Sequence, residues 1–208
     1  MSALFTPVQV GRYTLANRMV MAPMTRSRAD DAGVPSELAV TYYAQRATAG
    51  LIISEGVFPT AMGKGYVNTP GIETEAQVAT WKLVTEAVHA AGGKIAMQIL
   101  HFGRYAYHPE LVAPSALKAP ISAFRPHALT GDEVSQTIED YANAAALAQS
   151  AGYDGVEIMG SEGYLINEFI ARQTNQRDDE WGGAYENRIR FALEIVRRTR
   201  ARDRKSVV

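Results

Sequence analysis

Short apolar runs alternate along this chain with longer segments in which apolar residues recur at helical spacing. The runs are Met19–Met24, Leu51–Ser54, Lys94–Leu100 and Gly155–Met159. Uninterrupted apolar runs of this length are typical of strands that are buried on both faces of a parallel sheet. The remaining pattern predicts helices over Pro35–Ala49, Thr74–Ala91, Thr130–Ala151 and Tyr185–Ala201. Together these elements predict four βα units with right-handed crossovers.

Local signals mark several boundaries of these elements. Thr130 and Glu133 form a capping-box pattern at the start of the third helix, and Gly92 follows the end of the second. Ahead of the first unit, Val8–Val10 and Tyr13–Leu15 flank a glycine turn and predict a small hairpin.

The connection from His101 to Thr130 is longer than packing requires, which favours a functional loop. Four prolines argue against regular structure within it, namely Pro109, Pro114, Pro120 and Pro126. The order of elements fits a doubly wound open sheet, half of an eight-stranded barrel, or a complete four-stranded α/β domain. Periodicity alone leaves these three architectures open.

Composition narrows the class of protein. The 208 residues carry a formal net charge of −1 and no cysteine. We therefore expect no nucleic-acid or membrane partner, no disulfide and no thiolate metal site. The first residues lack the basic start and apolar run of a secretory signal, so we expect a cytoplasmic location. No P-loop, dinucleotide fingerprint or HExxH motif is present, and we expect no metal.

Polar and glycine-rich residues follow the predicted strands, and the carboxyl ends of parallel strands are where ligands bind in both β/α architectures. These groups are Pro23–Arg26, Ser54–Gly56, Gln98–Gly103 and Met159–Tyr164. Gln98 lies inside an apolar run, where a buried amide must find a partner, so we favour a ligand contact over a purely structural role.

Several long motifs carry a family resemblance, in the order MAPMTRSR, YYAQRATAGLIISEG, GKGY, QILHFGR, GYDGVEIMGSEGYLINEFI and TNQRDDEWGGAYENRIRF. Together they resemble the old yellow enzyme family of FMN-dependent NAD(P)H:flavin oxidoreductases, from about Leu4 to Arg200. Up to about Gly93 the chain is most similar to the ene-reductase branch. From Met97 onward it is more similar to the 2,4-dienoyl-CoA reductase branch.

The resemblance implies an eight-stranded β/α (TIM) barrel, of which this chain supplies about the first four units. Residues 1–202 are then the N-terminal part of the FMN-binding barrel domain, and we interpret 203–208 as a non-native tail. The implied FMN contacts are Pro23 and Met24 along the ring face, Thr25 at the C4 oxygen, Gly56 at the pyrimidine side, and Gln98 at N3 and the C2 oxygen.

The resemblance also implies a reaction. NAD(P)H reduces FMN, hydride passes from the flavin to an activated alkene, and Tyr164 donates the proton. Met159 and Glu162 stand where ene-reductases place a His/Asn or His/His pair that binds the substrate oxygen. The substrate class therefore stays open between an enone and a dienoyl thioester. His101 is a further candidate for a substrate contact, although a structural hydrogen bond is the role we favour.

Two other functions remain open at this stage. One is a different β/α-barrel enzyme, such as a lyase or isomerase, that shares the scaffold alone. The other is a non-catalytic fragment that acts as a structural or interaction module. A half barrel would expose strand edges and apolar helix faces, so we expect self-association through these surfaces and weak or absent FMN binding by this chain. We expect the TNQRDDEWGG segment to order the rim rather than to take part in catalysis.

Overall fold

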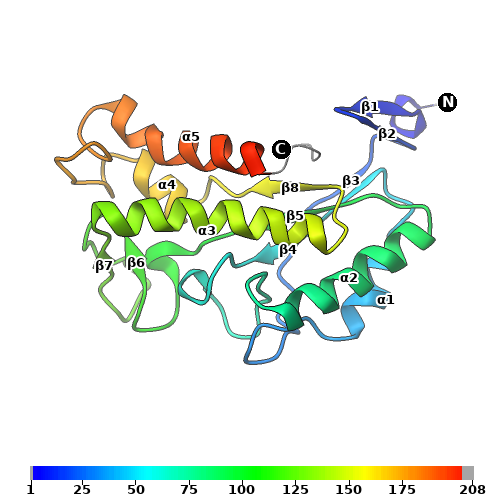
Figure 1. Ribbon diagram of the computed structural model, residues 1–208, viewed down its shortest axis with the longest axis horizontal. Helices are drawn as coiled ribbons and strands as arrows, with labels where there is room; N and C mark the ends of the chain where they lie inside the picture. The colour runs from blue at the N-terminus through cyan, green and yellow to red at the C-terminus, as the bar shows by residue number, and fades with distance from the viewer. Residues whose placement is uncertain (1, 203–208) are drawn as a thin grey trace.

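A parallel sheet forms the centre of the computed structural model, which describes residues 2–202 (Figure 1). Its strands are β3 (Val20–Met21), β4 (Leu51–Val57), β5 (Ile95–Ile99) and β8 (Gly155–Ile158). They lie in the order β3-β4-β5-β8, and every neighbouring pair is parallel. The strand order follows the chain without reversal. A doubly wound sheet reverses its order at a switch point, so this topology favours the wall of a barrel. The tail predicted at 203–208 lies outside the described residues.

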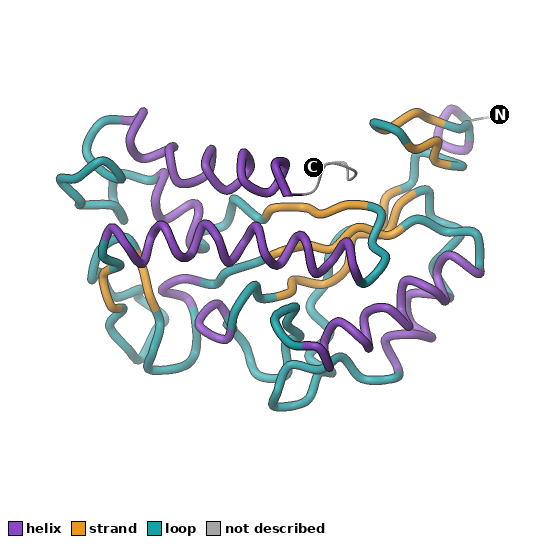
Figure 2. Tube along the Cα trace, viewed as in Figure 1, coloured by secondary structure: helices purple, strands orange, loops and turns teal. Residues whose placement is uncertain are grey.

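One short helix and three long helices connect and follow these strands, and they pack side by side in one layer. They are α1 (Leu38–Ala44), α2 (Glu75–Ala90), α3 (Gly131–Ser150) and α5 (Tyr185–Arg202). Contacts run from α1 to α2, from α2 to α3 and from α3 to α5, while α3 also packs on β5 and β8. Figure 2 shows the helices and the strands in different colours, in the same view as Figure 1. The four predicted βα units are confirmed.

The core lies between the helices and the sheet. Ile95, Met97 and Ile99 of β5 are fully buried, together with Trp81 of α2 and Tyr141 of α3. Capping boxes fix the starts of both long inner helices, because the side chains of Thr74 and Thr130 each accept a backbone N–H of the first turn. A capping interaction of this kind contributes about 1 kcal/mol.

Some predicted boundaries are wrong in detail. The predicted strand at 19–24 shrinks to β3, and the predicted helix at 35–49 shrinks to α1, whose end tightens into i→i+3 bonds such as Arg46 N to the Tyr43 carbonyl. The long connection contains a short helix, η3 (Gly103–Tyr105), and a parallel pair of two-residue strands, β6 (Val112–Ala113) and β7 (His127–Ala128). The four prolines lie outside those strands, so they do not interrupt the backbone hydrogen bonds between β6 and β7.

Helix α4 (Leu165–Ile170) was not predicted, since six residues are too few to show a helical period. Two further short 3₁₀ helices, η1 (Ala3–Phe5) and η2 (Ala61–Gly63), complete the described elements.

The predicted hairpin is confirmed as β1 (Val8–Val10) paired with β2 (Tyr13–Leu15). With the sheet it encloses a cavity of about 420 Å³ that Lys94 and Asp154 also line. These two residues directly precede β5 and β8, and the lining continues along the sheet to Glu157 and Ile158 at the carboxyl end of β8. No helix within residues 2–202 combines the length and the hydropathy that a membrane crossing requires.

Candidate functional site

The carboxyl ends of β4 and β5 bring Gly56 and Gln98 together, because the two residues are register partners. The register shifts by one residue between Ile53 and Gly56, which places a bulge at this point of β4. A Cβ added to Gly56 would lie 2.7 Å from Leu100 Cδ2 and 3.2 Å from Gln98 Oε1. A side chain at Gly56 would therefore displace Leu100, whereas glycine leaves the backbone close to the Gln98 amide.

Gln98 is 5% exposed and is held from the side of β8. Its Nε2 donates to Glu157 Oε1 at 2.7 Å and also contacts Met159 Sδ at 3.8 Å. Among the described residues no donor reaches its Oε1. The amide thus keeps one acceptor available at the carboxyl end of the sheet, while Glu157 fixes its orientation.

The segment Pro23–Thr25 is anchored by its next residue rather than by its own side chains. Arg26 N donates to Glu55 Oε2 at 2.8 Å, and Glu55 N donates to the Tyr43 phenol oxygen at 2.9 Å. Burial raises the pKa of Glu55, an effect that the hydrogen bond from Arg26 N and the Arg26 guanidinium oppose. Glu55 precedes Gly56, so this carboxyl group fixes the exposed Thr25 segment beside the Gly56–Gln98 pair.

Tyr164 occupies the N-cap position of α4, where the chain turns from β8 into the helix. Its ring packs edge-on against Phe102 with centroids 5.0 Å apart, and lies 6.2 Å from Tyr105. Its hydroxyl is 3.5 Å from the hydroxyl of Tyr66. Burial raises the pKa of Tyr164, and Tyr66 and Glu162 raise it further. The phenol therefore holds its proton throughout the physiological pH range.

Met159 and Glu162 lie in the segment that joins β8 to Tyr164. Met159 Sδ accepts weak contacts from Gln98 Nε2 and from Ser161 Oγ at 3.6 Å. Glu162 is exposed and has a left-handed backbone, with φ of 62°. A thioether and an ionised carboxylate offer no hydrogen-bond donor, so neither side chain can donate to a substrate oxygen.

His101 is 2% exposed and lies inside the protein. Its Nδ1 accepts from Gly103 N at 3.1 Å, and its carbonyl accepts from Leu165 N at 3.1 Å. Burial lowers the pKa of His101 to about 3, so the ring is neutral near pH 7. This placement favours the structural hydrogen bond over a substrate contact.

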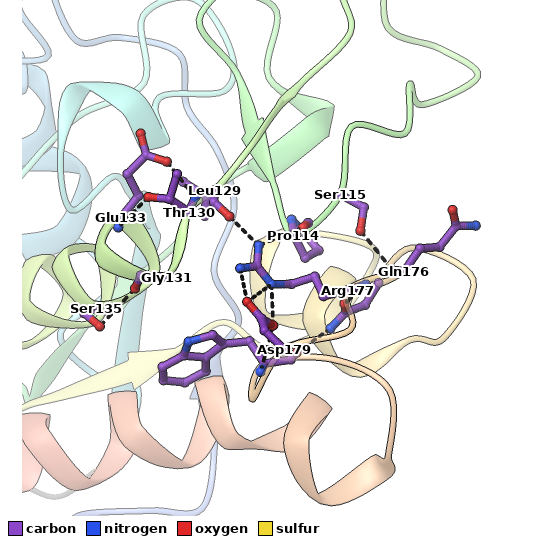
Figure 3. A network of polar contacts seen from close by, with 12 residues as sticks. Pro114, Ser115, Leu129, Thr130, Gly131, Glu133, Ser135, Gln176, Arg177 and Asp179 are labelled. Carbon is purple, nitrogen blue, oxygen red and sulfur yellow. Dashed lines mark hydrogen bonds and ion pairs between the residues drawn. The ribbon is translucent and has the colours of Figure 1, made fainter.

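The polar stretch after α4 holds the rim of the molecule together, as Figure 3 shows around Arg177. The Arg177 guanidinium donates to the carbonyls of Pro114 and Leu129, and its Nε donates to Asp179 Oδ1 at 2.9 Å. Arg177 thereby joins the long connection after β5 to the loop before α5. These bonds are structural in character.

Contacts connect three of the predicted site residues, Gly56, Gln98 and Met159, at the carboxyl ends of the strands, and Glu55 ties the segment that follows Thr25 to the same end. Arg26 bonds to Glu55, Gly56 lies against Gln98, and Gln98 contacts Met159. Residues Ser161 to Tyr164 then form a turn, which is closed by a hydrogen bond from Tyr164 N to the Ser161 carbonyl.

Sequence reasoning assigned no role to three residues that the structure places at or behind this site, namely Glu55, Tyr66 and Glu168. A carboxylate inside the apolar stretch LIISEG and a tyrosine in the GKGY motif were the available signals. Within the described part of the chain no cluster of metal-ligating side chains is found.

Comparisons with known proteins show the family and the fold to which this chain is similar. A sequence model described as the NADH:flavin oxidoreductase / NADH oxidase family matches residues 3–206. The chain is 47% identical over 208 residues to a chanoclavine-I aldehyde reductase of Penicillium roqueforti (strain FM164), which covers 95% of this chain and 56% of the relative. The chain thus spans about half the length of the curated relatives it matches.

Solved structures extend the similarity to the fold. Morphinone reductase in complex with tetrahydroNAD has a TM-score of 0.92 and 45% identity, covering 97% of this chain and 61% of that chain. The old yellow enzyme homologue from Zymomonas mobilis gives a TM-score of 0.92 and 45% identity, covering 96% of this chain and 60% of that chain. The predicted old yellow enzyme resemblance and the barrel-type fold are confirmed.

Proposed function

The chain belongs to the NADH:flavin oxidoreductase / NADH oxidase family, and from that premise we propose an FMN-dependent oxidoreductase that uses NAD(P)H to reduce activated C=C bonds. The observation that carries the proposal is the placement of Gly56 and Gln98, with the Thr25 segment anchored by Glu55, at one end of the sheet. The names of chanoclavine-I aldehyde reductase and morphinone reductase support the reaction class.

The donor set at the strand ends fits the pyrimidine edge of a flavin. Such an edge alternates donors and acceptors, and the Gln98 amide offers both, with Oε1 still available. Gly56 lets a ring approach the backbone closely, and the exposed Thr25 hydroxyl adds a donor. We propose that these three residues hold FMN, with Pro23 and Met24 along its ring. When bound, FMN supplies hydride transfer from NAD(P)H to the alkene.

Tyr164 is the proposed proton donor to the α-carbon of the alkene. Phe102 and Tyr105 hold its ring from two sides, while Tyr66 holds its hydroxyl. Its raised pKa keeps the proton on the phenol until a basic carbon develops in the substrate.

Two substrate classes follow from Met159 and Glu162. Because neither side chain donates a hydrogen bond, polarisation of a substrate carbonyl must come from other groups. An enone and a dienoyl thioester both remain within the proposal. A cytoplasmic location and self-association through the edges of β3 and β8 are also kept as predictions.

The test supplies the chain with excess FMN and follows NADPH or NADH oxidation with cyclohexenone or a 2,4-dienoyl-CoA. Tyr164→Phe should slow alkene reduction about 100- to 10,000-fold, while reduction of the flavin by NAD(P)H stays unchanged. Tyr185→Phe, at a tyrosine that is 54% exposed on α5, is the matched control. Absence of any nicotinamide oxidation with excess FMN would instead support the non-catalytic module.

A further inference from the structure

A second buried glutamate lies behind the Tyr164 end of the site. Glu168 belongs to α4, the helix that starts directly after Tyr164, and is 0% exposed. Its Oε1 accepts from Arg104 N at 2.9 Å. Within the described residues its Oε2 has no hydrogen-bond partner. A buried carboxyl group held by a single backbone donor requires an explanation, because it is costly to bury.

The turn opposite Glu168 is shaped to receive the carboxyl group. Gly103 has a left-handed backbone, with φ of 58°, and a Cβ at this residue would lie 2.4 Å from Glu168 Oε1. Gly103 N bonds to His101 Nδ1, and the His101 carbonyl accepts from Leu165 N, so the turn and the helix also meet through His101. Residue 103 must therefore be small and left-handed for this contact to exist.

We propose that Glu168 is a positioning residue for the Tyr164 phenol: its buried carboxyl group fixes the Gly103–Tyr105 turn against α4. Tyr105, which follows Arg104, is 6.2 Å from the Tyr164 ring between centroids, and a Cβ on Gly163 would lie 2.7 Å from Tyr105 Cε2. This contact between Glu168 and the Gly103–Tyr105 turn, here called the clip, thus acts on Tyr164 in two ways, through helix α4 and through the Tyr105 ring. It deepens the proposed function, since it rests on Tyr164 acting there as proton donor.

The clip holds in the protonated form of the carboxyl group. Burial raises the pKa of Glu168 to about 8, against opposing effects of the Arg104 N–H and guanidinium. Other titratable groups near it are Tyr141 on α3, whose pKa burial raises, and His101, which is neutral near pH 7. Arg104 is therefore the cation that faces Glu168 from these elements. Above about pH 8 the buried carboxyl group loses its proton. The Arg104 N–H and guanidinium favour the charged form, but the cost of burying that charge is larger, so the side chain is displaced from the turn.

The test uses the 208-residue chain without flavin or substrate. Tyrosine is labelled with ¹³C at Cζ, and the Tyr164 signal is assigned with Tyr164→Phe. In the unmodified chain this signal should shift with a midpoint near pH 8, below the range in which the phenol itself ionises. Glu168→Gln, which mimics the protonated acid, should keep the low-pH signal throughout. Glu168→Ala should displace the signal at every pH.

Glu86→Gln, at an exposed glutamate of α2, is the control and should titrate like the unmodified chain. A transition near pH 8 that persists in Glu168→Gln, or a flat Tyr164 signal in the unmodified chain, overturns the proposal. Because Glu168→Gln preserves the contact, the test stands even where Glu168→Ala fails to fold. Since no flavin is present, either result is independent of whether the chain binds FMN or reduces alkenes.

Discussion

The two ends of the candidate site are built with the same device in different charge environments. At the end with Thr25, Glu55 accepts the backbone N–H of Arg26; at the end with Tyr164, Glu168 accepts that of Arg104. The second oxygen of Glu55 lies 3.5 Å from the Tyr43 hydroxyl, and two arginines lower its pKa. The second oxygen of Glu168 has no partner among the described residues.

This difference shows that burial and hydrogen-bond partners together determine the form in which a carboxyl group anchors a loop. Burial raises the pKa of both carboxyl groups, but to about 8 for Glu168, which therefore anchors its turn as a neutral acid near pH 7. The Glu55 carboxyl group instead accepts from the backbone of a loop, at Arg26 N, and from the Tyr43 hydroxyl of α1. The Tyr164 end should consequently be the more sensitive to pH, and the Thr25 end the more sensitive to loss of a single partner.

The largest expected effect is on stability as a function of pH. The folded chain holds the Glu168 proton to about pH 8, whereas the group ionises near 4.5 in the absence of the fold. The folded state then binds more protons, so the free energy of unfolding falls as pH rises between these values, by on the order of 4 kcal/mol. Denaturant unfolding from pH 5 to 9 should show this slope, and Glu168→Gln should flatten it. If the slope of unfolding free energy against pH is unchanged in Glu168→Gln, groups other than Glu168 cause it.

A smaller effect isolates the fit of the turn against Glu168. Gly103→Ala forces an L-residue into a left-handed backbone and a Cβ into the carboxyl group, and should cost about 3 kcal/mol. Gly92→Ala is the matched control, since Gly92 also has a positive φ but opens into free space. It should cost about 1 kcal/mol. Equal costs, measured by urea unfolding, would show that the contact with Glu168 contributes nothing.

The smallest of these effects probes the Glu55 end. Tyr43→Phe removes the hydroxyl that accepts from Glu55 N and leaves that buried N–H without its partner. The free energy of unfolding should drop by about 1–2 kcal/mol. Tyr42→Phe, one residue earlier on α1, should change it by less than about 0.5 kcal/mol because Tyr42 is only half-buried. A Tyr43→Phe effect as small as that of Tyr42→Phe would contradict the anchoring role of the phenol.

Much of the fold could be predicted from the sequence because its elements have strong local signals. The apolar run around Met97 and the capping pair Thr130–Glu133 predict β5 and α3 within a residue or two. Where the local signal is weak, tertiary context decides. Helix α4 is stabilised by contacts such as Leu165 N to the His101 carbonyl, and β6 exists by pairing with β7 fourteen positions away from its end.

The site divides in the same way. Gln98 could be singled out because an amide interrupts an apolar run, and the structure gives it a partner in Glu157. Glu55 and Glu168 could not be assigned as anchors, because their partners are backbone N–H groups brought near by the turns after β3 and β5. A backbone donor leaves no residue-type signal in a sequence. For His101 the sequence favoured a structural hydrogen bond over a substrate contact, and the structure buries the ring, whose Nδ1 accepts from Gly103 N.

The most direct test of the whole account is an amide NMR titration of the ¹⁵N-labelled chain with FMN up to millimolar concentration, a range that detects even the weak binding we expect. The account predicts the largest shifts at Thr25, Gly56 and Gln98, with a smaller shift at Tyr164. Shifts gathered instead around Lys94 and Asp154, which directly precede β5 and β8 at the amino ends of the strands, would contradict it.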